Sequence, residues 1–209
     1  MKLVLAALCL AAPAAAFVAA PAPRAVASVG AKSPALPFLE QPKTLDGTLA
    51  GDVGFDPLGL SEIDDLGIDL YWMREAEIKH GRIAMLAAAG VLWVEAVGPL
   101  PGFPAAEGRS QMDVFWDAWD AHPNAVVSSL VFISIIEAVT GVAVTKGRES
   151  GERVPGDFLF NPLGFKVTEE IALKEIKNGR LAMWAVAGMI LQGVTTHATL
   201  GKNLVSMLE

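Results

Sequence analysis

The sequence predicts an all-α membrane protein with three transmembrane helices, the first and third forming a repeated, crossed pair. Hydrophobic residues make up 53% of the 209 residues, and charged residues make up only 19%. Three stretches are apolar over much of the thickness of a bilayer. The phrase that opens the first of them recurs at the start of the third.

The N-terminal residues 1–34 have the pattern of sorting signals. Lys2 precedes an apolar run over 3–12, and three alanines at 14–16 offer a cleavage site, so residues 1–16 are predicted to be a signal peptide. Residues 17–34 begin with Phe17, are rich in Ala and Pro, and contain no acid. This composition predicts a transit-peptide-like segment, with ordinary secretion as the alternative. The remaining domain then covers residues 35–209.

Membrane helices are expected at about 70–98, 123–145 and 167–195. The first and third stretches are uniformly apolar only over 83–97 and 181–194, so their charged beginnings must also be embedded if they cross. The middle stretch is apolar over 125–144, apart from Glu137 and a few hydroxyl groups. A soluble helical bundle is the alternative, but this middle stretch has no polar face for water.

The repeated phrase reads Glu-Ile-Lys-His-Gly-Arg-Ile-Ala-Met at 77–85 and Glu-Ile-Lys-Asn-Gly-Arg-Leu-Ala-Met at 175–183. A turn motif that starts with glycine precedes each copy, over 51–60 and 156–165, with Phe-Asp-Pro-Leu at 55–58 and Phe-Asn-Pro-Leu at 160–163. Asp or Asn before Pro favours a turn. Because one crossing separates the copies, both helices start on the same side of the membrane, related by an axis along its normal.

Each copy places a glutamate five residues before an arginine. On one helix this spacing puts the two side chains about 140° apart, which is poor geometry for an internal ion pair. Between the helices, the partners are Glu77 with Arg180 and Glu175 with Arg82. An unpaired charge at the membrane centre costs about 2.5–3.5 kcal/mol on insertion scales. Two reciprocal ion pairs between the first and third helices are therefore expected.

Side chains that can bind a hard metal are scattered singly along these helices. An arginine needs only one oxygen of Glu77 or Glu175, so the other oxygen is available to a cation. His80 and Asn178 occupy equivalent positions, about 200° around the helix from the arginines. A bare ion needs several ligands at one point, whereas single ligands suit a metal that a macrocycle already holds. Magnesium in chlorophyll fits these oxygen and nitrogen donors.

The two Glu-x-x-(His/Asn)-x-Arg-x-Ala-Met copies resemble the light-harvesting chlorophyll-binding family, specifically its red-lineage chlorophyll a/c branch of fucoxanthin- or peridinin-type antennae. The resemblance covers about residues 35–202. It implies short amphipathic surface helices beside the three membrane helices, and no enzyme activity. The leader resembles the bipartite plastid leaders of algae with secondary plastids, which implies a multi-pass protein of the plastid thylakoid membrane.

The resemblance also implies the binding residues. The magnesium of chlorophyll would be bound through Glu77, His80, Glu137, Glu175, Asn178 and Gln192. The bridging partners would be Arg82 and Arg180, with Arg180 also at a chlorophyll site. Carotenoids would lie against Phe55, Asp56, Pro57, Leu58, Met85, Phe160, Asn161, Pro162, Leu163, Met183 and Trp184. Four positions stay open as ligands: Ser129, Met207, His122 and His197.

By this resemblance the protein harvests light. Chlorophyll a, an accessory chlorophyll expected to be c, and carotenoids of the fucoxanthin, diadinoxanthin, peridinin or alloxanthin type would pass excitation energy to a photosystem. Segments 36–39 and 71–75 favour photosystem I, and the expected partners are its core, other antenna subunits and thylakoid lipids. The net charge of −7 argues against nucleic acid. A photoprotective, energy-dissipating relative and a small transporter with Glu137 as an acidic relay are the alternatives.

Overall fold

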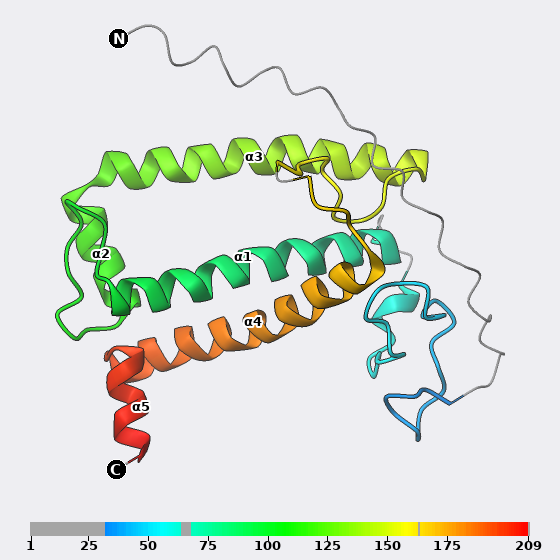
Figure 1. The fold of residues 1–209 in the computed structure, drawn as a ribbon, viewed down its shortest axis with the longest axis horizontal. Helices are drawn as coiled ribbons and strands as arrows, with labels where there is room; N and C mark the ends of the chain where they lie inside the picture. Colours follow the sequence, from blue (N-terminus) through cyan, green and yellow to red (C-terminus); the bar gives the residue numbers. More distant parts are fainter. Residues whose placement is uncertain (1–31, 64–67, 163, 209) are drawn as a thin grey trace, which may run out of the picture.

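The computed structural model describes residues 32–63, 68–162 and 164–208. The predicted signal peptide, nearly all of the transit-like segment, and Leu163 lie outside these residues. The described elements are the single-turn 3₁₀ helix η1 (Leu60–Glu62) and the α-helices α1 (Leu70–Ala96), α2 (Gln111–Ala121), α3 (Pro123–Ser150), α4 (Glu169–Thr196) and α5 (Leu200–Leu208) (Figure 1).

Side-chain caps fix where three of the helices begin. The carboxylate of Asp69 accepts the backbone N–H of Trp72 at the start of α1, and Ser110 and Thr168 cap α2 and α4 in the same way. These caps satisfy backbone donors that have no partner within the helix. At the start of α3, Pro123 occupies the first turn, where its missing N–H has no cost.

The middle helix, expected to end near 145, continues to Ser150. It ends at Gly151, whose φ of 67° is the left-handed conformation that glycine adopts most easily at a helix terminus. The added turn carries Arg148, whose Nε donates to Asp69 Oδ2 at 2.7 Å. This ion pair connects the end of α3 to the residue that caps α1. It stabilises the last turns of α3, which lie beyond the apolar part of that helix.

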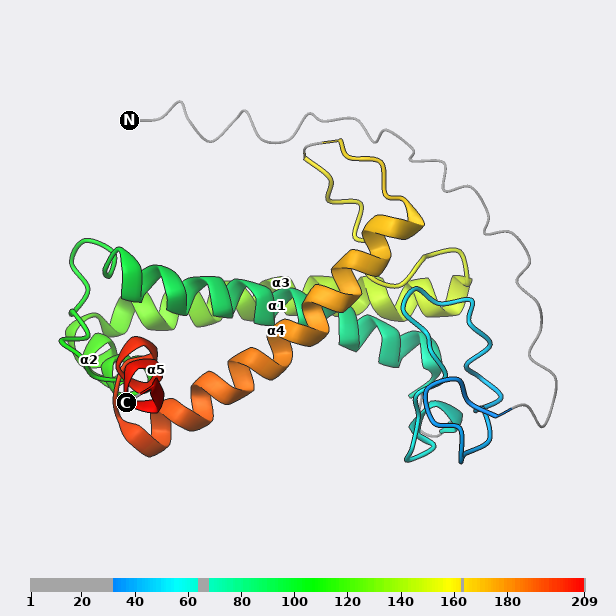
Figure 2. The ribbon, with the colours of Figure 1, turned by 60° about the horizontal axis from the view of Figure 1, so that its bottom comes forward.

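The helices α1 and α4 run in the same direction and cross each other, while α3 returns beside α1 (Figures 1 and 2). At the crossing, a Cβ atom built on Gly81 would lie 3.0 Å from the Cα of Gly179, and the reverse placement gives the same distance. This distance is shorter than nine in ten real Cβ contacts, so glycine on both helices favours the close approach. Ala84 and Ala182 are buried beside it.

The two ends of the bundle differ. At one end α2 and α5 lie across the ends of the long helices, and at the other lies the irregular chain that leads to α1 (Figure 1). The α2–α5 end is fastened through the backbone, since Ser110 N donates to His197 O at 3.1 Å and Arg109 forms an isolated bridge with Ala198. The short helices therefore hold the far ends of α1 and α4 together.

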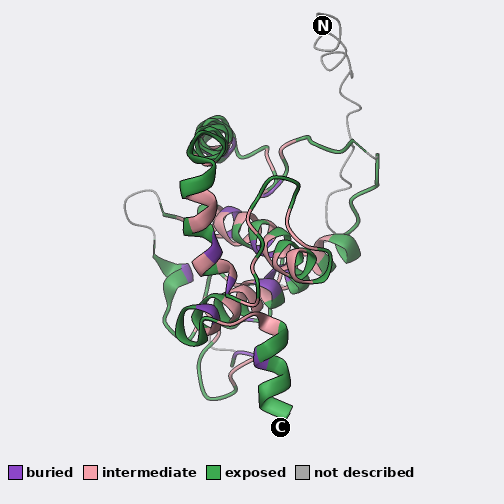
Figure 3. Ribbon diagram, turned by 90° about the vertical axis from the view of Figure 1, so that its left-hand side faces the viewer, coloured by how far each residue is buried: buried purple, intermediate pink, exposed green. Residues whose placement is uncertain are grey.

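Most of the surface of the long helices is exposed and apolar. Buried residues appear only as scattered segments between the helices (Figure 3). Within the described part of the chain, α3 is the one helix that is long and apolar enough to cross a membrane by length and composition, and none of its most apolar stretch is buried. An uncovered apolar surface of this extent fits contact with lipid or with other apolar molecules.

Candidate functional site

The crossing of α1 and α4 is held by two ion pairs between the helices. Arg82 Nε donates to Glu175 Oε1 at 2.7 Å, and Arg82 Nη1 donates to the carbonyl oxygen of Gly156 at 2.7 Å. Arg180 Nε donates in the same way to Glu77 Oε1 at 2.7 Å, and its Nη1 donates to the carbonyl oxygen of Gly51, the matching glycine of the first turn motif, at 2.9 Å. Each arginine thus binds the opposite helix together with the turn motif that precedes that helix.

The two glutamates are not equivalent. Glu77 Oε2 accepts a second hydrogen bond, at 2.8 Å, from Nη1 of the buried Arg74. The corresponding position in the second repeat is Ala172, and within the described part of the chain Glu175 is bonded only through Oε1. The expected spare oxygen is therefore present on Glu175. On Glu77, a metal would share an oxygen that already accepts a hydrogen bond, through its second lone pair.

His80 and Asn178 present single donor atoms away from the crossing. His80 Nδ1 lies 2.7 Å from the carbonyl oxygen of Ala76, which can only accept, so Nδ1 carries the proton and Nε2 keeps its lone pair. Asn178 Nδ2 donates to the carbonyl of Lys174 at 2.9 Å, which leaves its Oδ1 as the outward atom. Both side chains are exposed. Each repeat therefore orients one atom with the chemistry to bind a metal, by a hydrogen bond to its own helix.

Glu137 lies on α3 and is bound by a residue that sequence reasoning missed. Lys79 Nζ, on α1, donates to Glu137 Oε2 at 2.9 Å and to Thr140 Oγ1 at 2.8 Å. The sequence did contain one indication of this partner, which is the carboxylate itself. A negative charge in so apolar a stretch requires a cation from another helix. The opposite oxygen, Oε1, is left without a bond among the described residues.

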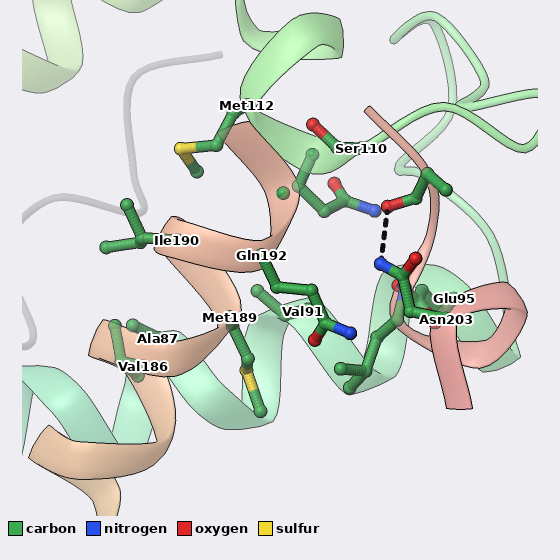
Figure 4. Close-up of a pocket in the computed structure, with 14 residues that line it drawn as sticks. Ala87, Val91, Glu95, Ser110, Met112, Val186, Met189, Ile190, Gln192 and Asn203 are labelled. Carbon is green, nitrogen blue, oxygen red and sulfur yellow. Dashed lines mark hydrogen bonds between the residues drawn. The ribbon is translucent and has the colours of Figure 1, made fainter. Parts of the chain in front are cut away.

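Gln192 lines a cavity of about 130 Å³ between α1, α4 and the two short helices (Figure 4). The cavity walls are mainly apolar, with Val91 and Met189 among them, and Glu95 and Asn203 at the end nearest α5. Glu95 accepts the first backbone N–H groups of α5, from Leu200 at 2.6 Å to Oε1 and from the next residue at 3.0 Å to Oε2. A carboxylate at a helix N-terminus is favourable, and here it fixes the wall of the cavity.

The two turn motifs use their polar residues locally. Asp56 accepts the backbone N–H groups of Leu60 and Ser61, at 3.0 and 2.7 Å. Partial burial raises the pKa of Asp56, but its hydrogen bonds with Ser61 and the neighbouring N–H groups outweigh burial and bring it below its ordinary value. Asn161 exchanges two hydrogen bonds with the backbone of Phe165. These bonds stabilise the turns.

The remaining residues expected to contact carotenoids are mostly accessible. The described aromatic and apolar residues at 55–58 and 160–162 are exposed, as is the tryptophan of α4, whereas Met85 and Met183 are partly buried beside the crossing. Accessible members are Phe55, Pro57, Leu58, Phe160, Pro162 and Trp184. The structure thus places apolar side chains of both repeats where a long apolar molecule can reach them.

Three of the four positions left open as ligands have hydrogen-bond partners. His122 Nε2 donates to the carbonyl of Gly102 at 2.6 Å, and Ser129 Oγ donates to its own helix. His197 Nδ1 lies 3.0 Å from Asp113 Oδ1. Met207 is exposed on α5.

The hydrogen bond with His197 lowers the pKa of the Asp113 carboxyl below its ordinary value of 3.8. Desolvation opposes this shift, but the His197 bond and the smaller effects of the Ser110 hydroxyl and Arg109 together outweigh it. A depressed folded pKa means that this carboxylate stabilises the fold above its unfolded pKa, and that this contribution is lost as pH falls through the lower folded value. Asp113 is therefore not an acid that titrates between about pH 5 and 6, which the photoprotective alternative requires.

The donor atoms fit a metal that arrives inside a macrocycle better than a bare ion. Across residues 32–63, 68–162 and 164–208, no group of three or more His, Cys, Asp or Glu side chains is placed to hold a metal ion. Single donors instead occur on separate helix faces, and apart from Gln192 each is oriented by a hydrogen bond or ion pair. Chlorophyll needs only one axial protein ligand of this kind, because the ring fills the other positions of its magnesium.

Comparisons with known proteins show which proteins this chain is similar to. Residues 41–194 match the family model described as chlorophyll A-B binding protein. The chain is 36% identical over 193 residues to the photosystem I chlorophyll a/b-binding protein 3-1 of Arabidopsis thaliana, covering 78% of this chain and 71% of the relative. It is also 36% identical over 204 residues to the photosystem I chlorophyll a/b-binding protein 5 of the same plant, covering 83% and 75%. Chlorophyll a-b binding protein 8 of Solanum lycopersicum is 35% identical over 193 residues, covering 78% and 71%.

Proposed function

Because this chain belongs to the chlorophyll A-B binding protein family, a family of light-harvesting proteins, we propose that it is an antenna of the thylakoid membrane that delivers excitation energy to photosystem I. The observation that carries the proposal is the pair of cross-helix ion pairs with single metal-binding atoms displayed around them. The names of the first two relatives support photosystem I in particular. Its core and other antenna subunits are the partners.

Six side chains hold chlorophyll in this proposal: Glu77, His80, Glu137, Glu175, Asn178 and Gln192. Bound chlorophyll supplies absorption of light and transfer of excitation to a neighbouring pigment. The chain sets positions and orientations. Ligands on one helix are spaced by its 1.5 Å rise per residue, so Asn178 and Gln192 lie about 21 Å apart along α4. The arginine bridges hold α1 and α4 at a fixed crossing, and hence fix the ligands on one helix relative to those on the other.

Three helices cross the membrane in this arrangement, with α1 and α4 embedding their charged beginnings beside α3. The ion pairs of Arg82 with Glu175 and of Arg180 with Glu77 support this, because each of these four embedded charges has a partner. The carotenoids extend from the two turn motifs along the crossed pair, against the exposed aromatic side chains of those motifs and the methionines beside the crossing. The apolar surface of α3 faces lipid or neighbouring antenna subunits.

The pigments belong to the red-lineage branch in this proposal, with chlorophyll c and carotenoids of the fucoxanthin, diadinoxanthin, peridinin or alloxanthin type. The two-part leader predicted for 1–34 supports this, because it resembles the leaders that direct proteins to plastids of secondary origin. The relatives are plant proteins named for chlorophyll a and b, so chlorophyll b is the alternative accessory pigment. Chlorophylls b and c are chemically distinct. Chromatography of pigments extracted from the purified protein separates them: chlorophyll c supports the proposal, and chlorophyll b in its place contradicts it.

The association with photosystem I is tested by fractionation of gently solubilised thylakoid membranes. The protein is expected to migrate with photosystem I particles and to contribute its own bands to the excitation spectrum of their long-wavelength emission. Recovery only with photosystem II particles, with no such contribution, would overturn this assignment while leaving the antenna function intact.

Replacing His80 by Ala is expected to remove one chlorophyll per chain and to leave the fold unchanged. The imidazole takes no part in the interhelical ion pairs, and its only hydrogen bond in the described structure is to its own helix. Pigment content per polypeptide and far-ultraviolet circular dichroism measure the two effects. His122→Ala is the matched control and should keep the full complement. An unchanged chlorophyll content in the His80 variant would exclude His80 as a ligand.

A further inference from the structure

Lys79 connects three parts of the structure. Its ammonium group donates to Glu137 and Thr140 on α3, and it lies 5.5 Å from the ring centroid of Phe158, in the segment before α4. The lysine side chain is 20% exposed, whereas that of Glu137 is 51% exposed. The cation is therefore enclosed and the carboxylate is accessible on its other side.

The second repeat contains the same lysine in a different setting. Lys177 follows Glu175 by two residues, just as Lys79 follows Glu77. It is exposed, and its ammonium group makes no ion pair within the described part of the chain. The difference arises because α3 packs beside α1, so only the first lysine meets a carboxylate of the middle helix. The two lysines are thus equivalent in sequence but differ in their contacts.

Glu137 needs this partner because of its depth. It lies roughly 20 Å from each end of α3, at 1.5 Å per residue, within a stretch of high hydropathy. An ionised carboxylate there is unfavourable unless a cation neutralises it. Lys79 provides that charge through Oε2 and leaves Oε1 pointing to no described residue. The arrangement parallels Glu175, where an arginine from another helix takes one oxygen and the second is spare.

We propose that Lys79 is the positioning residue for the chlorophyll of the middle helix: it neutralises Glu137, fixes its rotamer and leaves Oε1 as the oxygen that would bind the magnesium. This inference rests on the antenna function proposed above. Lys79 touches no pigment in this role, and it acts through the charge and orientation of Glu137. The pairing also makes occupancy of a site on α3 depend on the packing of α1.

The experiment compares the full chain with four variants, each purified from thylakoids with its pigments: Lys79→Met, Lys79→Arg, Glu137→Ala and the double variant Lys79→Met/Glu137→Gln. Chlorophyll per polypeptide and low-temperature absorption are measured. Glu137→Ala should lose one chlorophyll and its absorption band. Lys79→Met should lose the same band, and Lys79→Arg should keep it. The double variant should recover it, because a glutamine ligand is neutral and needs no counter-charge.

Lys177→Met is the matched control, and it should keep the full pigment content because its ammonium group pairs with no carboxylate among the described residues. Full pigment content in Lys79→Met would overturn the proposal, as would a double variant that loses as much as Lys79→Met. If Lys79→Met does not accumulate, the double variant decides, since restored accumulation with the band present supports the charge argument and failure contradicts it. A wild-type protein without pigment would refute the antenna function itself.

Discussion

Replacing Arg82 by Leu is expected to destabilise the pigment–protein complex more than any other single charge removal at the crossing of α1 and α4. The change leaves Glu175 without its cation and releases the carbonyl of Gly156, so it loosens α4 and the turn motif before it together. Breaking a pair removed from water costs about 3–5 kcal/mol. We take the lower end, because the two side chains are 39% and 35% exposed in the protein alone.

A loss of about 3 kcal/mol corresponds to a fall in Tm of about 6–12 °C for a chain of this size. Circular dichroism of the pigments during heating measures it. The double variant Arg82→Leu/Glu175→Gln, which removes both charges, should recover more than half of the loss. Arg109→Leu is the control, because Arg109 pairs with Asp117 at the surface and its removal should change Tm little. Equal stability of the Arg82 variant and the wild type would contradict the role of the ion pair.

Replacing Gly81 by Val is expected to prevent assembly of the crossed pair. Even a Cβ at this position would lie 3.0 Å from the Cα of Gly179, and valine adds two further methyl groups. Overpacking in a well-packed interior costs about 1–3 kcal/mol when the surroundings can move. Here the contact is with backbone, so the helices must separate, and their separation lengthens both interhelical ion pairs. The yield of pigmented protein and its Tm should both fall sharply.

The control lies on the same helix. Gly90→Val makes the same chemical change on α1, but a Cβ at Gly90 meets nothing within 4 Å. It should assemble with a normal yield, apart from the modest effect of a β-branched residue on helix propensity. If the variants at 81 and 90 behave alike, the close glycine contact does not hold the helices together.

The charged pairs at the crossing were predictable from the sequence. The spacing of Glu77 and Arg82 excludes an internal bridge, and the second copy supplies complementary partners on a helix that starts on the same side. Pairing between the two helices is therefore the arrangement in which each of these four charges has a partner of opposite charge. The approximate helix ranges followed from apolar length, and the outward positions of His80 and Asn178 followed from helix geometry.

Features that depend on a third element were not predictable. Lys79 and Lys177 occupy equivalent positions in the repeated phrase, yet only Lys79 pairs with Glu137. The reason is that α3 packs against α1, which the phrase itself does not determine. Arg74, which occupies the second oxygen of Glu77, breaks the symmetry of the repeats through a residue outside the repeated phrase. A pattern in one segment carries no information on such contacts.

The ends of the bundle show the same limit. The middle helix was expected to stop near 145, because hydropathy falls there. It continues because Arg148 pairs with Asp69 and Gly151 supplies the terminating left-handed residue. Glu95 had no assigned partner in the sequence, and the structure shows it binding the first N–H groups of α5. In both cases a polar contact between distant segments sets a boundary that local composition does not.

The central claim is that this chain holds chlorophylls and carotenoids close enough to exchange excitation energy. The most direct test is the fluorescence excitation spectrum of the purified native protein, recorded at the red emission maximum of chlorophyll a. Carotenoid and accessory-chlorophyll bands in that spectrum are the predicted result, because only bound and coupled pigments can sensitise this emission. A stably folded protein that is colourless, or one whose carotenoid bands are absent from the excitation spectrum, would contradict the claim.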